Sequence, residues 1–195
     1  HTLSRAMCWV ALDRLLELHA RGEIEAPAER FARTADAIRD EVERRGFHPG
    51  LNSYVATLDG DDIDASLLLL PLYGYIDADH PRMRGTGAAI RERLGSGSLI
   101  YRYRYGDGLT GHEGAFGVCS FWSVECLAGQ GERDLAMQDF DRLLSYANDV
   151  GLFAEQIDVE SGEPLGNFPQ AYTHIGLIGA ALTLAGPGTG PRHDP

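Results

Sequence analysis

The feature that most constrains the fold of this 195-residue chain is an alternation between two kinds of predicted helix. A helix that is apolar on every side must be covered on every side, whereas an amphipathic helix is covered on one face. The amphipathic segments are 28–45, 81–94 and 132–149, and the almost wholly apolar ones are 65–72, 114–128 and 171–185. The alternation predicts an all-α fold with an inner and an outer layer, as in an α/α barrel.

The connections between these segments alternate in length. Apolar residues at helical spacing predict a further helix over 2–20, and weak strand signals at 53–57 and 99–105 are interpreted as loop. Short connections follow the inner helices, and long ones precede them at 46–63, 95–113 and 150–170. Long ordered loops in a compact domain are usually functional. We therefore expect the three long loops to meet on one face and to form one site.

Composition excludes several classes of protein. A formal net charge of −12 argues against a nucleic-acid binder, which needs a basic face. No apolar run approaches the roughly 20 residues that span a bilayer, and no leader is recognised, so a cytoplasmic location is expected. Three cysteines in apolar stretches are predicted to be buried thiols: Cys8, Cys119 and Cys126. Since no H-x-x-x-H or C-x-x-C occurs, no zinc site is expected.

Two carboxylates are candidates for chemistry. Glu155 lies between apolar residues, where partial desolvation tends to raise the pKa and suits acid/base work; the alternative is a capping or salt-bridge contact. Glu113 stands at the start of predicted helix 114–128, where it could stabilise the helix dipole or accept a sugar hydroxyl. Asp64 is expected to cap segment 65–72, within an acidic turn whose spacing lacks the glycine and final glutamate of a calcium loop.

The second long loop interleaves arginine with tyrosine. If this segment is extended, Arg102 and Arg104 share one face, and the three tyrosines between and beside them share the other. Aromatic faces beside hydrogen-bonding side chains suit a neutral, hydroxyl-rich ligand such as a sugar. His112 and His174 lie near the starts of two inner helices, and His174 is either a core histidine with satisfied hydrogen bonds or a ligand-binding one.

Five motifs, in this order along the chain, resemble glycoside hydrolase family 15, above all its bacterial glucoamylase-like and trehalase-like members. They are MCWVALDR at 7–14, DASLLLLP at 64–71, EGAF at 113–116 with CSFW at 119–122, AEQID at 154–158, and GNFPQAYTHIGLI at 166–178. The resemblance implies an (α/α)6 barrel of which this chain supplies about half to two-thirds. Residues 1–185 would belong to the catalytic domain and 186–195 to a flexible tail.

The resemblance also implies an activity, namely hydrolysis of α-glucosidic bonds in oligo- or polysaccharides with inversion, glucoamylase-like or trehalase-like. Such a reaction needs two carboxylates about 6.5–9.5 Å apart. The family's general base maps onto Glu155, and Arg102 with Tyr103 matches an Arg-Tyr pair that binds the terminal glucose. Further substrate-binding candidates in matching motifs are Glu113, Trp122, Gln156, Tyr172 and His174.

The general acid is the main departure from the family pattern. In the family it is a glutamate of a Trp-Glu segment preceding the helix that begins here at Thr2, and this segment is absent. We therefore expect the acid upstream, and the segment alone to be inactive. A half-barrel would expose the sides of 65–72 and 114–128, so a missing N-terminal half or a second copy is an expected partner. No metal or organic cofactor is expected, although phosphate or Mg²⁺ dependence is possible for a trehalase-like enzyme. The alternative function is a catalytically incomplete barrel fragment for carbohydrate binding or assembly.

Overall fold

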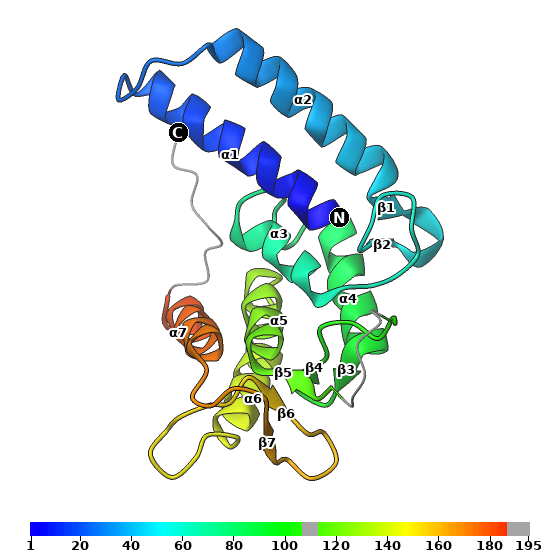
Figure 1. Ribbon diagram of the computed structural model, residues 1–195, viewed down its shortest axis with the longest axis vertical. Helices are drawn as coiled ribbons and strands as arrows, with labels where there is room; N and C mark the ends of the chain where they lie inside the picture. Colours follow the sequence, from blue (N-terminus) through cyan, green and yellow to red (C-terminus); the bar gives the residue numbers. More distant parts are fainter. Residues whose placement is uncertain (107–112, 187–195) are drawn as a thin grey trace.

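The computed structural model describes residues 1–106 and 113–186, and this part of the chain is mostly helical (Figure 1). The predicted flexible tail 186–195, apart from Gly186, and the predicted position of His112 near a helix start concern residues outside the described part. The helices are α1 Thr2–Ala20, α2 Ala28–Arg45, α3 Leu69–Leu72, α4 Pro81–Leu94, α5 Gly117–Gly129, α6 Arg133–Leu144 and α7 Ala171–Ala185. Two 3-10 helices, η1 Pro49–Leu51 and η2 Ala65–Leu68, complete the helical elements. The predicted all-α class is therefore confirmed.

Local capping explains why several helices begin where the sequence predicts. Pro81 opens α4, and the His80 ring accepts a hydrogen bond from the Arg82 N–H at 3.2 Å. The Asp64 carboxylate accepts one from the Ser66 N–H at 2.7 Å and caps η2, as expected. Helix α7 begins after Gln170, whose side chain accepts from the Tyr172 N–H at 3.3 Å.

Two predicted boundaries are wrong. Segment 114–128 does not begin as helix, because Ala115–Phe116 (β5) pairs antiparallel with Gln156–Ile157 (β6) and α5 starts only at Gly117. Glu113 therefore precedes a strand rather than a helix, and the expected helix-dipole role falls away. Segment 132–149 ends as helix at Leu144, five residues early. There the chain turns, and the Asn148 side chain accepts hydrogen bonds from two following N–H groups.

Short strands occupy all three long connections, where loop had been predicted. Each pair is antiparallel and two residues long. They form a hairpin of β1 Phe47–His48 with β2 Ser53–Tyr54, a hairpin of β3 Gly95–Ser96 with β4 Leu99–Ile100, and a sheet ordered β5-β6-β7 with β7 at Pro164–Leu165. The sheet joins the second long connection to the third. The first connection lies elsewhere, since Tyr54 is fully buried and its N–H donates to the Thr86 hydroxyl of α4 at 2.9 Å.

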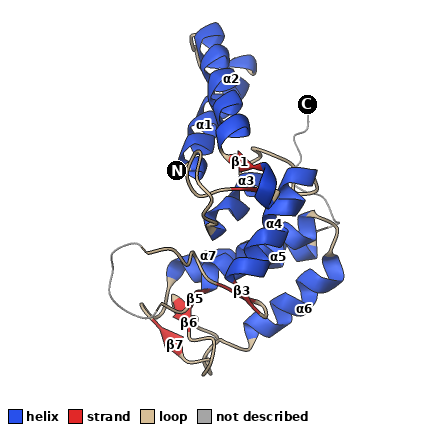
Figure 2. Cartoon of the chain, turned by 90° about the vertical axis from the view of Figure 1, so that its right-hand side faces the viewer, coloured by secondary structure: helices blue, strands red, loops and turns tan. Residues whose placement is uncertain are grey.

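Helices α1 and α2 form a pair at one end of the molecule, and α5, α6 and α7 lie with the three-stranded sheet at the other (Figures 1 and 2). The apolar core follows this division, with one cluster among α1 to α4 and one side of α5, and a second among α5, α6 and α7. Helix α5 packs against α4, α6 and α7. It is thus an inner helix, as its apolar sequence predicts.

The expectation about which apolar helices are left uncovered is wrong. Segment 65–72 is largely buried among α1, α4 and α5, and helix α5 is largely buried among α4, α6 and α7. Helix α7 is the uncovered one, since only one side of it packs on α5 and α6. Its outer side chains are 57–69% exposed: Tyr172, Ile175, Ile178 and Leu182. We call these four residues the α7 face.

The cysteines agree only in part with the prediction. All three are free thiols, and Cys119 and Cys126 are buried, but Cys8 is exposed on α1. Position 8 lies on the outer side of α1, away from the buried Ala6 and Val10. No helix among the described residues has the length and apolarity required to cross a membrane.

Candidate active site

A cavity of 380 Å³ lies among α1, η2, α3, α5 and the start of α7, and two long connections contribute to it. The second connection supplies Arg102, and the third supplies Glu155 and Gln170. The first connection contributes nothing to its lining, so the expected meeting of three loops is reduced to two. The complete lining is Leu3, Ser66, Leu69, Arg102, Phe116, Val118, Cys119, Trp122, Glu155, Gln170, Tyr172 and Thr173.

Glu155 is half-buried, and hydrogen bonds fix both its main chain and its carboxylate. Its N–H donates to the Asn167 carbonyl at 2.9 Å, and its carbonyl accepts from the Gly117 N–H, the first residue of α5, at 3.0 Å. Its carboxylate oxygen Oε2 accepts from the Asn167 N–H at 3.1 Å and from the Asn167 side-chain amide at 2.9 Å. Asn167 therefore fixes both the main chain and the carboxylate of Glu155.

Gly166 lets the Asn167 segment approach this carboxylate. Its φ is +74°, in the left-handed region that glycine adopts without strain. A Cβ atom at this position would lie 2.8 Å from Glu155 Oε2. The sequence GN in the motif at 166–178 thus has a geometric reason, which is close contact with the candidate base.

Arg102 is exposed at the cavity wall, with its backbone fixed by the neighbouring 3-10 helix. Its carbonyl accepts from the Ala65 N–H at 2.8 Å. The guanidinium lies 5.5 Å from the Tyr103 ring centroid and 6.0 Å from that of Phe116, within cation–π range. The three tyrosines of this segment are half-buried and both arginines exposed, as an extended chain predicts. Arg104, however, lies over the Tyr101 ring at 4.3 Å and lines a different cavity.

The cavity brings together four of the predicted residues, namely Glu155, Arg102, Trp122 and Tyr172. One carboxylate, one guanidinium and two aromatic side chains, one of them 69% exposed, thus share a single concave site. Apolar faces with a few convergent polar groups are the usual composition of a small-molecule site. A carboxylate held in place beside a bound ligand can act as a general base.

The other predicted residues lie outside the cavity lining. Gln156 accepts a hydrogen bond from the Gly114 N–H at 2.8 Å through its side-chain carbonyl, so its amide holds the start of β5. His174 uses both ring nitrogens structurally: Nδ1 bonds the Gln170 carbonyl at 2.7 Å and Nε2 accepts from the Phe153 N–H at 3.4 Å. Tyr103 stacks on Tyr105, and Glu113 is exposed before β5.

Three polar lining residues were missed from the sequence. Gln170 and Thr173 stand at the start of α7, and the Thr173 hydroxyl donates to the Ala154 carbonyl at 2.9 Å. Ser66 enters from η2. The motifs at 64–71 and 166–178 contain all three, but the local pattern does not indicate which of their side chains face a cavity.

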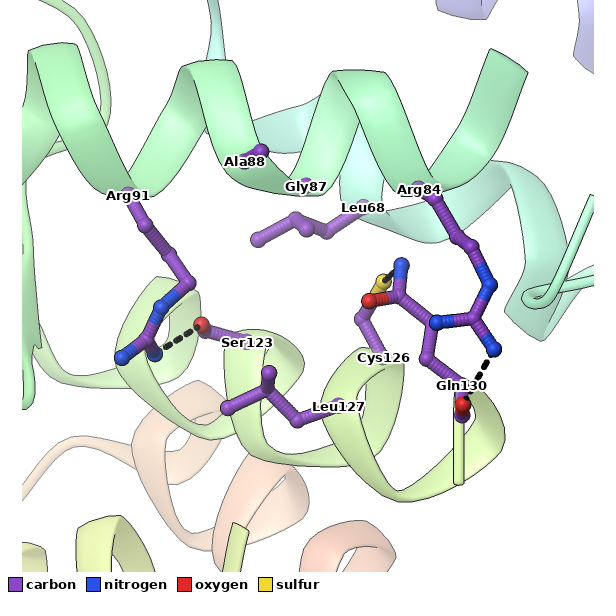
Figure 3. Close-up of a pocket in the computed structure, with 9 residues that line it drawn as sticks. All are labelled: Leu68, Arg84, Gly87, Ala88, Arg91, Ser123, Cys126, Leu127 and Gln130. Carbon is purple, nitrogen blue, oxygen red and sulfur yellow. Dashed lines mark hydrogen bonds between the residues drawn. The ribbon is translucent and has the colours of Figure 1, made fainter. Parts of the chain in front are cut away.

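A second cavity, of 330 Å³, separates α4 from α5 and holds none of the predicted residues (Figure 3). Two arginines of α4 flank this cavity, and both donate hydrogen bonds to other parts of the protein. Arg91 donates to the buried Asp139 at 2.8 Å, and Arg84 donates to the Gln130 carbonyl at 2.6 Å. We therefore interpret this cavity as part of the packing between an outer and an inner helix. Within residues 1–106 and 113–186, no three histidine, cysteine or acidic side chains gather as a metal site would require.

The sequence model of glycosyl hydrolases family 15 matches residues 1–133 and 133–182, nearly the whole chain. The chain belongs to this family. Among its relatives, the trehalase of Mycobacterium tuberculosis is 41% identical over 93% of this chain, and that of Thermoplasma volcanium is 37% identical over 94%. The chain spans only 27% and 30% of these two relatives, respectively.

Two solved glycosidase structures share the fold of this chain. A glycosidase variant in complex with glucose superposes with a TM-score of 0.80 at 18% identity, over 95% of this chain and 52% of the other. A second glycosidase variant gives a TM-score of 0.79 at 19% identity. The chain therefore has the fold of part of an (α/α)6 barrel, as the family resemblance implies, and the alternation of apolar and amphipathic helices predicts its two layers.

Proposed function

We propose that this chain is the C-terminal part of a glycosidase that hydrolyses α-glucosidic bonds with inversion, and that Glu155 is its general base. The observation that carries the proposal is the cavity in which the fixed carboxylate of Glu155 lies with Arg102, Trp122 and Tyr172. Family membership supports a glycosidic substrate.

The geometry suits activation of a water molecule. Both hydrogen bonds from Asn167 fall on Oε2 of Glu155, so within the described residues Oε1 is left to accept a proton from water. The resulting hydroxide attacks the anomeric carbon, and the glycosidic bond breaks on the opposite side of the sugar. Arg102 and the aromatic faces of Trp122 and Tyr172 bind and orient the glucose.

The leaving oxygen needs a proton from a general acid, which we place on a segment outside these 195 residues. The acid must lie about 6.5–9.5 Å from Glu155, so that water fits between base and sugar. The α7 face supports this arrangement, because it begins at Tyr172 in the cavity and continues as an uncovered apolar surface. We propose that the remaining helices of the barrel cover it and bring the acid to the cavity.

We propose trehalose as the substrate, because the relatives in Mycobacterium tuberculosis and Thermoplasma volcanium are both called trehalases. Hydrolysis by two carboxylates needs no organic cofactor, and we propose none. A cytoplasmic location stays a prediction from the sequence, and the resemblance leaves a dependence on phosphate or Mg²⁺ open for a trehalase-like enzyme.

The test follows sugar release by proton NMR, using the longest natural chain that contains these residues, on trehalose, maltotetraose and isomaltose. Inversion yields one β-glucose and one α-glucose from each trehalose, because water attacks one anomeric carbon and the other keeps its configuration. We expect Glu155→Gln to reduce the rate about 1,000-fold, the middle of the range for a lost general base. Glu160→Gln, which changes an exposed carboxylate in the same connection, is the matched control. Two α-glucose molecules per trehalose, or full activity in Glu155→Gln, would refute the proposed mechanism.

A further inference from the structure

We propose that Asp64 is a positioning residue for Arg102, acting through the hydroxyl of Tyr105. The inference rests on the proposed function only in taking Arg102 as a sugar-binding group. It extends that function by assigning a role to a residue that lies outside the cavity lining. Asp64 touches no substrate in this scheme, and its effect on binding passes through the 102–105 segment.

The carboxylate of Asp64 joins two parts of the chain. It is only 8% exposed, and its two oxygens have different partners. Oδ1 accepts from the Ser66 N–H at 2.7 Å, which caps η2, and Oδ2 accepts from the Tyr105 hydroxyl at 3.0 Å. The next residue, Ala65, donates its N–H to the Arg102 carbonyl at 2.8 Å. Asp64 and Ala65, which are consecutive, thus hold the 102–105 segment at two points, at Tyr105 and at Arg102.

A series of ring contacts carries this restraint to the guanidinium. Tyr105 stacks on Tyr103, with ring centroids 4.5 Å apart and planes inclined by 18°. The Arg102 guanidinium in turn lies over the Tyr103 ring at 5.5 Å. Fixing the Tyr105 hydroxyl therefore fixes a stack of two rings on which the charged group rests.

The chemistry of the pair suits a permanent restraint. Burial, together with the negative charge of Asp64, raises the pKa of Tyr105 to about 12, so the hydroxyl keeps its proton and remains a donor. A carboxylate accepts from both the Ser66 N–H and this hydroxyl without offering a competing donor. Since Ser66 also lines the cavity, Asp64 fixes two points of the same wall.

The experiment compares Tyr105→Phe and Asp64→Asn with the wild type in the longest natural chain that contains this segment. Tyr105→Phe removes only the hydroxyl. We expect the KM for the hydrolysed glucoside to rise about tenfold in each variant, the effect of one lost hydrogen bond to a charged group, with kcat within threefold. In an Arg102→Ala background, Tyr105→Phe is expected to leave KM unchanged, because the group that it positions is gone.

Hydrogen exchange measured by mass spectrometry supplies a readout besides activity. The Ala65 amide, which donates to the Arg102 carbonyl, is expected to exchange at least tenfold faster in both variants. Tyr75→Phe is the matched control, since the Tyr75 hydroxyl also bonds a carboxylate, that of Glu43 at 2.8 Å, away from the cavity. It should change neither KM nor the exchange of Ala65.

The outcomes separate this inference from the proposed function. Hydrolysis with unchanged KM, or unchanged Ala65 exchange in Tyr105→Phe, would overturn the role of Asp64 and leave the proposed function standing. A wild type that hydrolyses none of the glucosides would overturn the proposed function. Faster exchange of Ala65 in the two variants would then still support the positioning of the Arg102 segment by Asp64.

Discussion

At the scale of single residues, the close contact between Gly166 and Glu155 predicts that a side chain at position 166 lowers both stability and activity. Gly166→Ala places a methyl group 2.8 Å from the Glu155 carboxylate in a backbone conformation with φ +74°. We expect a loss of about 1–2 kcal/mol in unfolding free energy from the backbone strain. We also expect kcat to fall at least tenfold, because the base is displaced. Urea denaturation and the sugar-release assay measure the two effects.

Gly162→Ala separates strain from displacement. Gly162 belongs to the same connection and has φ +76°, but its Cβ would meet only the Tyr146 ring, at an ordinary 3.7 Å. This variant should therefore lose similar stability and keep its kcat. Equal losses of kcat in both variants would mean that loop strain, and not contact with Glu155, determines the rate.

The burial of Glu125 predicts how folding stability depends on pH. It lies half-buried between α5 and α7, opposite Gly179, and accepts a long hydrogen bond of 3.5 Å from the Thr183 hydroxyl. Burial raises its pKa from the ordinary 4.5 to about 7. Between these pH values the folded chain holds a proton that the unfolded chain has released, so folding stability falls as pH rises through this window. Above about pH 7 the full cost of a buried charge remains.

The variant Glu125→Gln removes that cost. Each pKa unit corresponds to about 1.4 kcal/mol, and after allowance for partial exposure we expect a gain of about 2 kcal/mol in unfolding free energy at pH 8. Little gain is expected at pH 5, where the wild type is already protonated in the fold. Urea denaturation at both pH values measures the difference, with exposed Glu160→Gln as the control. A gain that is the same at pH 5 and pH 8 would show that ionisation of Glu125 is not its cause.

The position of a residue in the cavity could be predicted from the sequence only for part of each motif. Glu155, Arg102, Trp122 and Tyr172 reach the cavity because strand pairing and helix starts bring their motifs together. Gln156 belongs to the same motif as Glu155, yet the next position along a strand points to the opposite side, where it binds Gly114. His174 lies in the first turn of α7, and its hydrogen-bond partners, Gln170 and Phe153, belong to the preceding connection. Neighbours in sequence thus differ in role through alternation that the motif does not display.

At the scale of elements, the helices were predictable because their signals are local. Pro81, Asp64 and the apolar periodicity act within a few residues, and the predicted bounds of α4 and α7 agree with the structure. The strands left only weak local signals, at 53–57 and 99–105 where β2 and β4 form, because each strand is two residues long and is defined by its pairing. Residues 115–116 become β5 only through pairing with 156–157, about 40 positions later. That same pairing holds Glu155 beside α5, so the element that the sequence missed is the one that builds the site.

At the scale of the whole molecule, the α7 face is the surface on which we propose that the barrel continues. An inner helix is covered on every side in a closed two-layer barrel, and α7 is covered on one. The solved glycosidases that share this fold are about twice as long as the aligned part, since this chain covers 52% of one of them. We therefore propose that the remaining helices of such a barrel cover the α7 face, and that its apolar residues are interface residues in a longer chain.

This assignment predicts opposite behaviour for two equally exposed residues. Leu182 on the α7 face and Val150 in the third connection are 69% and 70% exposed, respectively. In the longest natural chain that contains this segment, Leu182→Asn should lower the unfolding free energy by about 3 kcal/mol, because it puts a polar group into a covered interface. Val150→Asn should stay within about 0.5 kcal/mol, the range of surface substitutions. Denaturant titration gives both values. Equal effects would show that the α7 face stays open to solvent in the longer chain, and a second copy would then be its better candidate occupant, detectable as a dimer by sedimentation and lost in Leu182→Asn.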